Sequence, residues 1–192
     1  MNGNSEPQAI AQGLRWQTHA KLGASVSALY VWSYFVTVSV ITPLQVAVFP
    51  SFVMSLLFLP HGVRVLTAWM YGWRSVGYLL PGAVLCNLHF AGDRAFDGDI
   101  LAGTLASLLA GPVAFAVVRR IVGPGAMTVG AARLQAVVAV GFLASMVNLI
   151  SLKLAYGLSA AEGVVIFVGD TSGLLASVLI VWGTLRLLGR HL

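Results

Sequence analysis

Charged residues are scarce in this sequence. Of 192 residues, 11 are Lys or Arg and 6 are Asp or Glu, so that 9% of the chain is charged while 58% is hydrophobic. A typical soluble domain is roughly 25% charged and about 45–50% apolar. The composition therefore argues against an ordinary soluble domain and predicts a membrane protein.

Cysteine and catalytic motifs are scarce as well. The single cysteine, Cys86, excludes a disulfide framework and a Cys-rich metal site. The spacings typical of serine hydrolases, zinc peptidases, dithiol enzymes and P-loop proteins do not occur. His61 and His89 are expected on opposite sides of the membrane, so they cannot flank one haem iron. We therefore expect no enzyme activity, no metal and no cofactor.

The net charge of +5 does not indicate nucleic-acid binding, because the basic residues are dispersed at the ends of apolar segments. These segments predict an all-α, polytopic integral membrane protein with about six transmembrane helices. The expected spans are residues 22–42, 44–59, 75–90, 100–118, 134–152 and 163–185. Pro43 is expected to end the first span, because the residue before a proline avoids the helical conformation.

Between the second and third spans, His61–Tyr71 is predicted to form a short helix entered through Pro60. It is too short to cross a bilayer, so an interfacial or re-entrant position is expected. The domain organisation that follows is a cytoplasmic N-terminal tail of residues 1–21, a six-helix membrane domain of residues 22–185 and a cytoplasmic C-terminal tail of residues 186–192.

The distribution of charge predicts the orientation. With six spans, nine of the 11 basic residues fall on one side, and the other side receives only Arg94 and Lys153. Five of the six acidic residues lie on or near that second side, three of them in the Gly92–Asp99 loop. The positive-inside rule then places both termini in the cytoplasm. The predicted location is a bacterial inner (cytoplasmic) membrane.

Three ionisable residues are candidates for ligand binding. Asp170 lies inside an apolar segment, where a carboxyl group is costly and suggests function; the alternative is a cap at the outer end of the sixth helix. Arg64 could hold an acidic ligand or pair with a carboxylate, or it could extend its side chain to the membrane surface. His61 is a weaker candidate, because a cap or interface role is common at such a position.

Two amides complete the candidate ligand-binding set, Asn87 and Asn148, for which a hydrogen bond between helices is the alternative role. Arg64 is expected to enter from the inner side and Asp170 to lie near the outer end of the sixth helix. We therefore predict that these two residues do not pair, and that Asp170 meets Asn87, a hydroxyl group or water. Loss of Asp170 is then expected to disturb a ligand response more than folding.

The sequence resembles the membrane-associated sensor domain of bacterial signalling proteins, the first type described. The likeness rests on the Leu-Pro-His-Gly entry at Leu59–Gly62, the turn Gly72–Arg74, a Pro/Gly span ending near Asn87, and Gly169–Asp170 followed by Gly173. That family commonly has two prolines where this chain has Pro60 and His61, has more spans, and is fused to output domains.

The resemblance implies a sensory or ligand-binding membrane module for an unknown small molecule, acting through a separate cytoplasmic output protein. A second likeness, in size and topology, is to the substrate-binding subunits of energy-coupling-factor vitamin transporters, which dock a cytoplasmic energising protein. A structural or assembly protein with no ligand is the third alternative. The lipid bilayer is the expected partner in all three.

Overall fold

The structure is a computed structural model that describes residues 5–50, 55–123 and 132–189, with side chains described from Trp16 and, in the last range, from Gln135. Every secondary-structure element in these ranges is helical, which confirms the predicted all-α class. Four helical runs are long and apolar enough to cross a membrane: Trp16–Val48, Gly98–Val122, Gln135–Tyr156 and Ala160–Leu187. These helices are compatible with the predicted membrane protein. Because only four of the described helical runs are long and apolar enough to cross a membrane, the predicted six spans are not confirmed.

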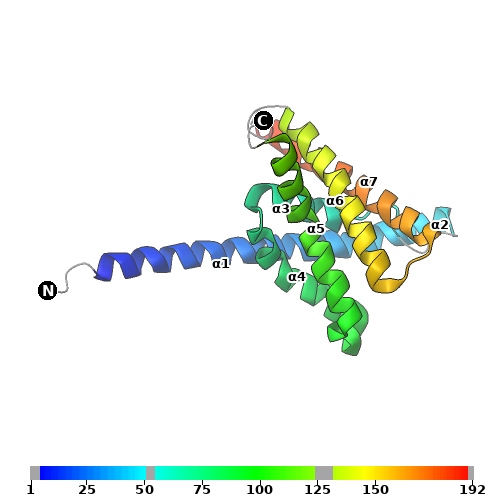
Figure 1. The fold of residues 1–192 in the computed structure, drawn as a ribbon, viewed down its shortest axis with the longest axis horizontal. Coiled ribbons are helices and arrows are strands. Elements are labelled where there is room, and N and C mark those ends of the chain that lie inside the picture. Colours follow the sequence, from blue (N-terminus) through cyan, green and yellow to red (C-terminus); the bar gives the residue numbers. More distant parts are fainter. Residues whose placement is uncertain (1–4, 51–54, 124–131, 190–192) are drawn as a thin grey trace.

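The first helical run continues through Pro43, so the expected boundary there is wrong. It consists of α1 (Ser5–Val36), a π-helix (Thr37–Ile41) and α2 (Thr42–Val48), which follow one another in one direction (Figure 1). The N–H of Thr42 bonds to the carbonyl of Thr37. This five-residue spacing widens the helix just before Pro43 and accommodates a residue that has no N–H.

The expected second span, residues 44–59, is therefore not a helix of its own. Residues 44–48 end the first run, residues 55–58 are not helical, and Leu59 begins α3 (Leu59–Tyr71). The non-helical stretch lies along α7 (Ala160–Leu187), where the N–H of Phe58 bonds to the carbonyl of Gly169 at 2.8 Å. Ser172 of α7 also donates a hydrogen bond to the carbonyl of Leu56. Backbone outside a helix thus finds partners within the protein.

Helix α3 occupies the centre of the bundle. Its neighbours are α1, α4 (Arg74–Ala91), α5 (Gly98–Val122), α6 (Ala132–Tyr156) and α7. Pro60 lies in its first turn, as predicted, and residues 60–65 are all buried. An interfacial helix would keep one face in water, so this burial argues against the interfacial alternative.

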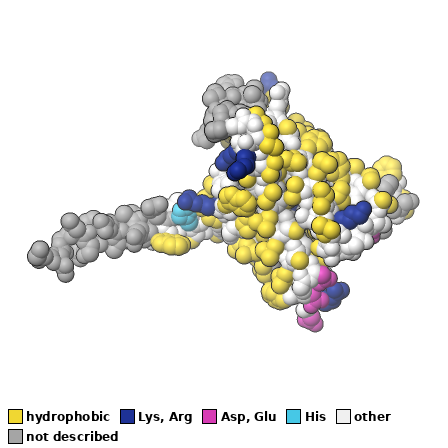
Figure 2. Space-filling view, viewed as in Figure 1, with side chains coloured by type: hydrophobic (Ala, Val, Ile, Leu, Met, Phe, Trp, Pro, Cys, Tyr) yellow, Lys and Arg dark blue, Asp and Glu magenta, His cyan; other side chains and the backbone are white. Residues whose placement is uncertain are grey.

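Two connections join the remaining helices. A 3₁₀-helix (Gly92–Phe96) links α4 to α5 and carries exposed charges, with Arg94 contacting Asp97 at 2.8 Å and Asp99 at 3.6 Å. Ser159 and Glu162 form a capping box at the start of α7, in which each side chain bonds to the other residue's N–H. Figure 2 shows apolar side chains over much of the visible surface of the bundle, with charged side chains gathered toward its ends.

Candidate functional site

Three ionisable side chains meet inside the bundle. The Nη2 atom of Arg64 lies 3.7 Å from Oδ1 of Asp170, and Nδ1 of His61 lies 3.3 Å from Oδ2 of the same carboxylate. Arg64 and His61 are also in contact, with 3.2 Å between Nη2 and Nδ1. The prediction that Arg64 and Asp170 do not pair is therefore wrong.

Their pairing follows from where the two helices begin. α7 starts at Ala160 rather than at Gly163, so Asp170 lies ten residues into the helix, a depth of about 15 Å. α3 starts in the middle of the bundle, because the non-helical residues 55–58 bring the chain there first. Both charges thus lie at a similar level within the bundle, where their side chains meet.

The three residues are buried, which excludes their peripheral alternatives. The exposed fractions are 1% for His61, 4% for Arg64 and 2% for Asp170. An arginine that extended to the membrane surface, or a carboxylate that capped an exposed helix end, would keep its polar atoms in water. Arg64 does not reach the surface, Asp170 does not cap α7, and His61 lies in the bundle interior rather than at the interface.

The hydrogen-bond partners of His61 favour a neutral imidazole. The hydroxyl of Ser145 donates to the carbonyl of Gly141 at 3.1 Å, so its oxygen accepts from Nε2 of His61 at 3.0 Å. Arg64 can only donate, so Nδ1 of His61 accepts the hydrogen bond from Nη2. We therefore assign the neutral Nε2–H tautomer, which leaves the cluster with one positive and one negative charge.

Asn148 extends the cluster across the bundle from α6. Its Nδ2 donates to Oδ2 of Asp170 at 2.6 Å, and its Oδ1 accepts from the hydroxyl of Ser107 at 2.7 Å. Asn87 lies apart from this chain of bonds and donates to Thr104 at 2.9 Å. The alternative of helix-to-helix hydrogen bonds is thus confirmed for both amides, and Asn148 also holds the carboxylate.

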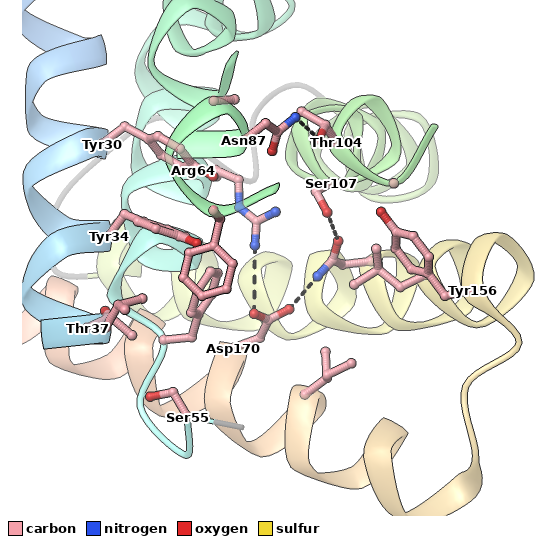
Figure 3. Close-up of a pocket in the computed structure, with 18 residues that line it drawn as sticks. Tyr30, Tyr34, Thr37, Ser55, Arg64, Asn87, Thr104, Ser107, Tyr156 and Asp170 are labelled. Atoms are coloured by element: carbon pink, nitrogen blue, oxygen red, sulfur yellow. Dashed lines mark hydrogen bonds and ion pairs between the residues drawn. The ribbon is translucent and has the colours of Figure 1, made fainter. Parts of the chain in front are cut away.

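A cavity of about 540 Å³ borders the cluster (Figure 3). Four of the five predicted site residues line it, namely Arg64, Asn87, Asn148 and Asp170, while His61 lies behind the ion pair. The volume falls within the range of roughly 300–1,000 Å³ that is common for small-molecule sites. Its wall is formed by α1 with the π-helix, α3, α4, α5, α6 and α7.

Much of the remaining wall consists of aromatic rings and hydroxyl groups that the sequence analysis did not select. The rings are Tyr30, Tyr34, Phe58, Phe90 and Tyr156, and the hydroxyls of Thr37, Ser55, Thr104 and Ser107 lie between them. Aromatic residues in membrane segments are commonly interface anchors, and serine and threonine are common in such helices. Composition alone therefore carried no signal for them.

Arg64 is held but not fully hydrogen-bonded. Its guanidinium lies 5.8 Å from the centre of the Phe58 ring, within the distance of a cation–π contact. Its Nε atom is buried and has no hydrogen-bond partner among the described residues. At 3.7 Å, its contact with Asp170 is longer than a hydrogen bond. Arg64 also lines the cavity, so its guanidinium can donate to an acceptor atom placed there.

Comparison with protein-family models, with curated proteins and with solved structures gives no match. In the part of the chain that the structure describes, no group of three His, Cys, Asp or Glu residues is arranged to hold a metal ion. The chemistry of the site must therefore be inferred from the ion pair, the amides and the cavity they border.

Proposed function

We propose that this chain is a small polytopic membrane protein that binds a small molecule in the central cavity and acts through a partner protein. The observation that carries the proposal is the cavity of about 540 Å³, which has the buried Arg64–Asp170 pair on its wall. Buried ionisable residues in a membrane protein usually mark a functional site, because they are costly to keep. The resemblance to bacterial membrane sensor domains points to the same class of function.

The construction of the wall suggests how binding would be transmitted. A ligand in the cavity would touch side chains from six α-helices, including Tyr34 of α1, Asn87 of α4 and Asp170 of α7. A ligand that fits one arrangement of these helices better than another shifts the population toward it. A partner protein that contacts the helix ends would then detect the change.

For the topology, we propose six crossings with both termini in the cytoplasm. In this arrangement the second crossing consists of the non-helical residues 55–58 followed by α3, and α4 forms the third. Non-helical backbone at such a depth is tolerated where protein covers it. The bonds from Phe58 and Leu56 to α7 supply that cover.

Reporter fusions test this topology. Fusions after Gly125 and after His191, which lie outside the described residues, are expected to report the cytoplasm, and fusions within Gly92–Asp99 the outer side. The measurement is the ratio of alkaline phosphatase activity to green fluorescent protein signal at each site. A reversed signal at any one of the three sites would contradict the six-crossing arrangement.

Ligand binding is tested by a thermal-shift screen of the purified protein against metabolites of all charge types. A bound ligand at about 100 times its Kd stabilises the folded state by roughly 2.7 kcal/mol. We expect at least one compound to stabilise the wild type but neither Val38→Trp nor Leu152→Trp. Both residues line the cavity and are only partly buried, so the larger ring fills the space without a change in the ion pair.

The comparison is valid for a blocking variant that unfolds at a temperature near that of the wild type. Two such variants are used so that the test can still be made if one of them does not fold. If no compound in the screen distinguishes the wild type from these variants, the cavity is not a binding site and the third alternative, a structural or assembly protein, is favoured.

A transporter subunit remains the second candidate, and one observation favours it. The cavity is lined by Asn87 and Phe90 near the end of α4, by Gly103 near the start of α5 and by Tyr156 at the end of α6. It therefore lies toward the end of the bundle that carries the α4–α5 and α6–α7 connections. In the proposed topology this is the outer side, where a transporter would collect its substrate.

A further inference from the structure

We propose that the cavity takes an uncharged ring compound whose carbonyl oxygen accepts a hydrogen bond from Arg64. This inference deepens the proposed function and rests on it, because it names the chemical class of the ligand for the same site. Three properties of the cavity lead to it: its charge balance, the guanidinium on its wall and its aromatic side chains.

The charge balance favours a ligand without net charge. Among the described residues that line the cavity, Arg64 and Asp170 carry opposite charges and lie 3.7 Å apart, and the adjoining His61 is assigned as neutral. A carboxylate ligand would leave this buried group of charges with a net value of −1, and an ammonium ligand with +1. Either excess would lie against a buried ion pair, which is costly unless a further charge compensates it.

The hydrogen-bond inventory favours an acceptor. Arginine has five N–H donors and no acceptor. Asn148 already occupies Oδ2 of Asp170 at 2.6 Å, whereas Nε of Arg64 is buried without a partner among the described residues. Arg64 also lines the cavity, so a carbonyl oxygen there can accept a hydrogen bond from its guanidinium without adding charge. The ion pair supplies the donor, and its own carboxylate keeps the site neutral.

The aromatic wall favours a flat ring attached to that carbonyl. Phe58 lies against the guanidinium, and Tyr34 meets Phe58 edge to face with ring centres 6.5 Å apart. Tyr34 also meets Phe90, with ring centres 5.7 Å apart and planes at 85°. Such surfaces stack on a flat ring and discriminate little among its substituents. Figure 3 shows Tyr34 on the same side of the cavity as Arg64.

Four probes of equal ring size test the proposal: naphthamide, naphthoate, naphthylmethylammonium and ethylnaphthalene. Binding to the protein in lipid nanodiscs is measured by calorimetry, with empty nanodiscs and Val38→Trp as controls for partition into lipid. We expect naphthamide to bind more tightly than each of the others by about tenfold or more, the equivalent of one hydrogen bond to a charged group.

The double variant Arg64→Met/Asp170→Asn removes the guanidinium donor and keeps the site without net charge. Methionine has no N–H group, and the side-chain oxygen of asparagine can still accept the hydrogen bond from Asn148. We expect this variant to bind naphthamide no more tightly than ethylnaphthalene. Arg64→Lys, whose ammonium group is also a donor, is expected to keep part of the preference.

Three results would overturn the inference. Tightest binding of naphthoate or naphthylmethylammonium would show that the cavity accepts a charged ligand, and an unchanged preference for naphthamide in Arg64→Met/Asp170→Asn would remove the role of the arginine. Equal binding of all four probes to the wild type and to Val38→Trp would mean that none of them enters the cavity. A charged metabolite that passes the thermal-shift screen would leave the proposed function standing while this inference fails.

Discussion

Asp170→Ala is expected to destabilise the folded bundle by about 3–5 kcal/mol, because it removes one partner of a buried ion pair and leaves the other charge uncompensated. Arg64 is only 4% exposed, and the loss of the carboxylate would also free the Nδ2 group of Asn148, which donates to Asp170 at 2.6 Å. The measurement is equilibrium unfolding in detergent micelles. Asp93→Ala, at an exposed position in the α4–α5 connection, is the matched control and should change stability by less than about 0.5 kcal/mol.

A second background isolates the pair itself. In a protein that already carries Arg64→Met, Asp170→Ala removes a carboxylate that no longer faces a cation, and it should cost less than it does in the wild type. We expect a coupling energy of about 1–3 kcal/mol between the two sites. An equal loss in both backgrounds would show that the 3.7 Å contact contributes nothing to stability.

The sequence led to the opposite expectation, namely that the loss of Asp170 disturbs a ligand response more than it disturbs folding. The difference lies in the contact with Arg64. When no cation pairs with the carboxylate, its presence in an apolar helix implies a ligand, whereas the observed pair gives it a structural role as well. A loss of binding in Asp170→Ala must therefore be read together with the stability of the variant.

Most of the helices could be predicted from the apolar segments of the sequence. The expected spans 75–90, 100–118, 134–152 and 163–185 lie within α4, α5, α6 and α7, and the entry into α3 through Pro60 is confirmed. Pro43 misled the prediction, because the usual effect of proline assumes a regular α-helix on both sides. The π-helix at Thr37–Ile41 accommodates the proline, and residue composition does not predict a π-helix.

The members of the candidate site could be selected from sequence, but their contacts could not. Asp170 and Asn148 stood out because polar groups are rare in apolar segments, and both line the cavity. Whether Arg64 meets Asp170 depends on the depth at which α3 begins, and a tertiary contact sets that depth: the bond from Phe58 to Gly169 of α7. Hydropathy along one helix contains no information about such a contact.

Gly173→Ala is expected to destabilise the protein by about 3 kcal/mol or more, at the upper end of the usual range for overpacking. A Cβ atom at Gly173 would overlap the carbonyl of Phe58 and approach the N atom of Leu59 at 2.9 Å. These are backbone atoms, so no side chain can turn away to make room. On the other side of the contact, a Cβ at Gly62 of α3 would meet Ser177 and the carbonyl of Gly173.

Gly183→Ala is the matched control on the same helix, because a Cβ there meets nothing within 4 Å. Alanine is a better helix former than glycine by about 1 kcal/mol, so the control should leave stability unchanged or raise it. The two variants thus differ in the sign of their effect, which unfolding in detergent measures directly.

Because the contact with α7 positions residues 55–58, and with them the start of α3, Gly173→Ala should also displace Arg64 from Asp170 and abolish ligand binding in any population that folds. A Gly173→Ala protein as stable as Gly183→Ala would show that α7 does not hold the entry into α3 as closely as the structure indicates.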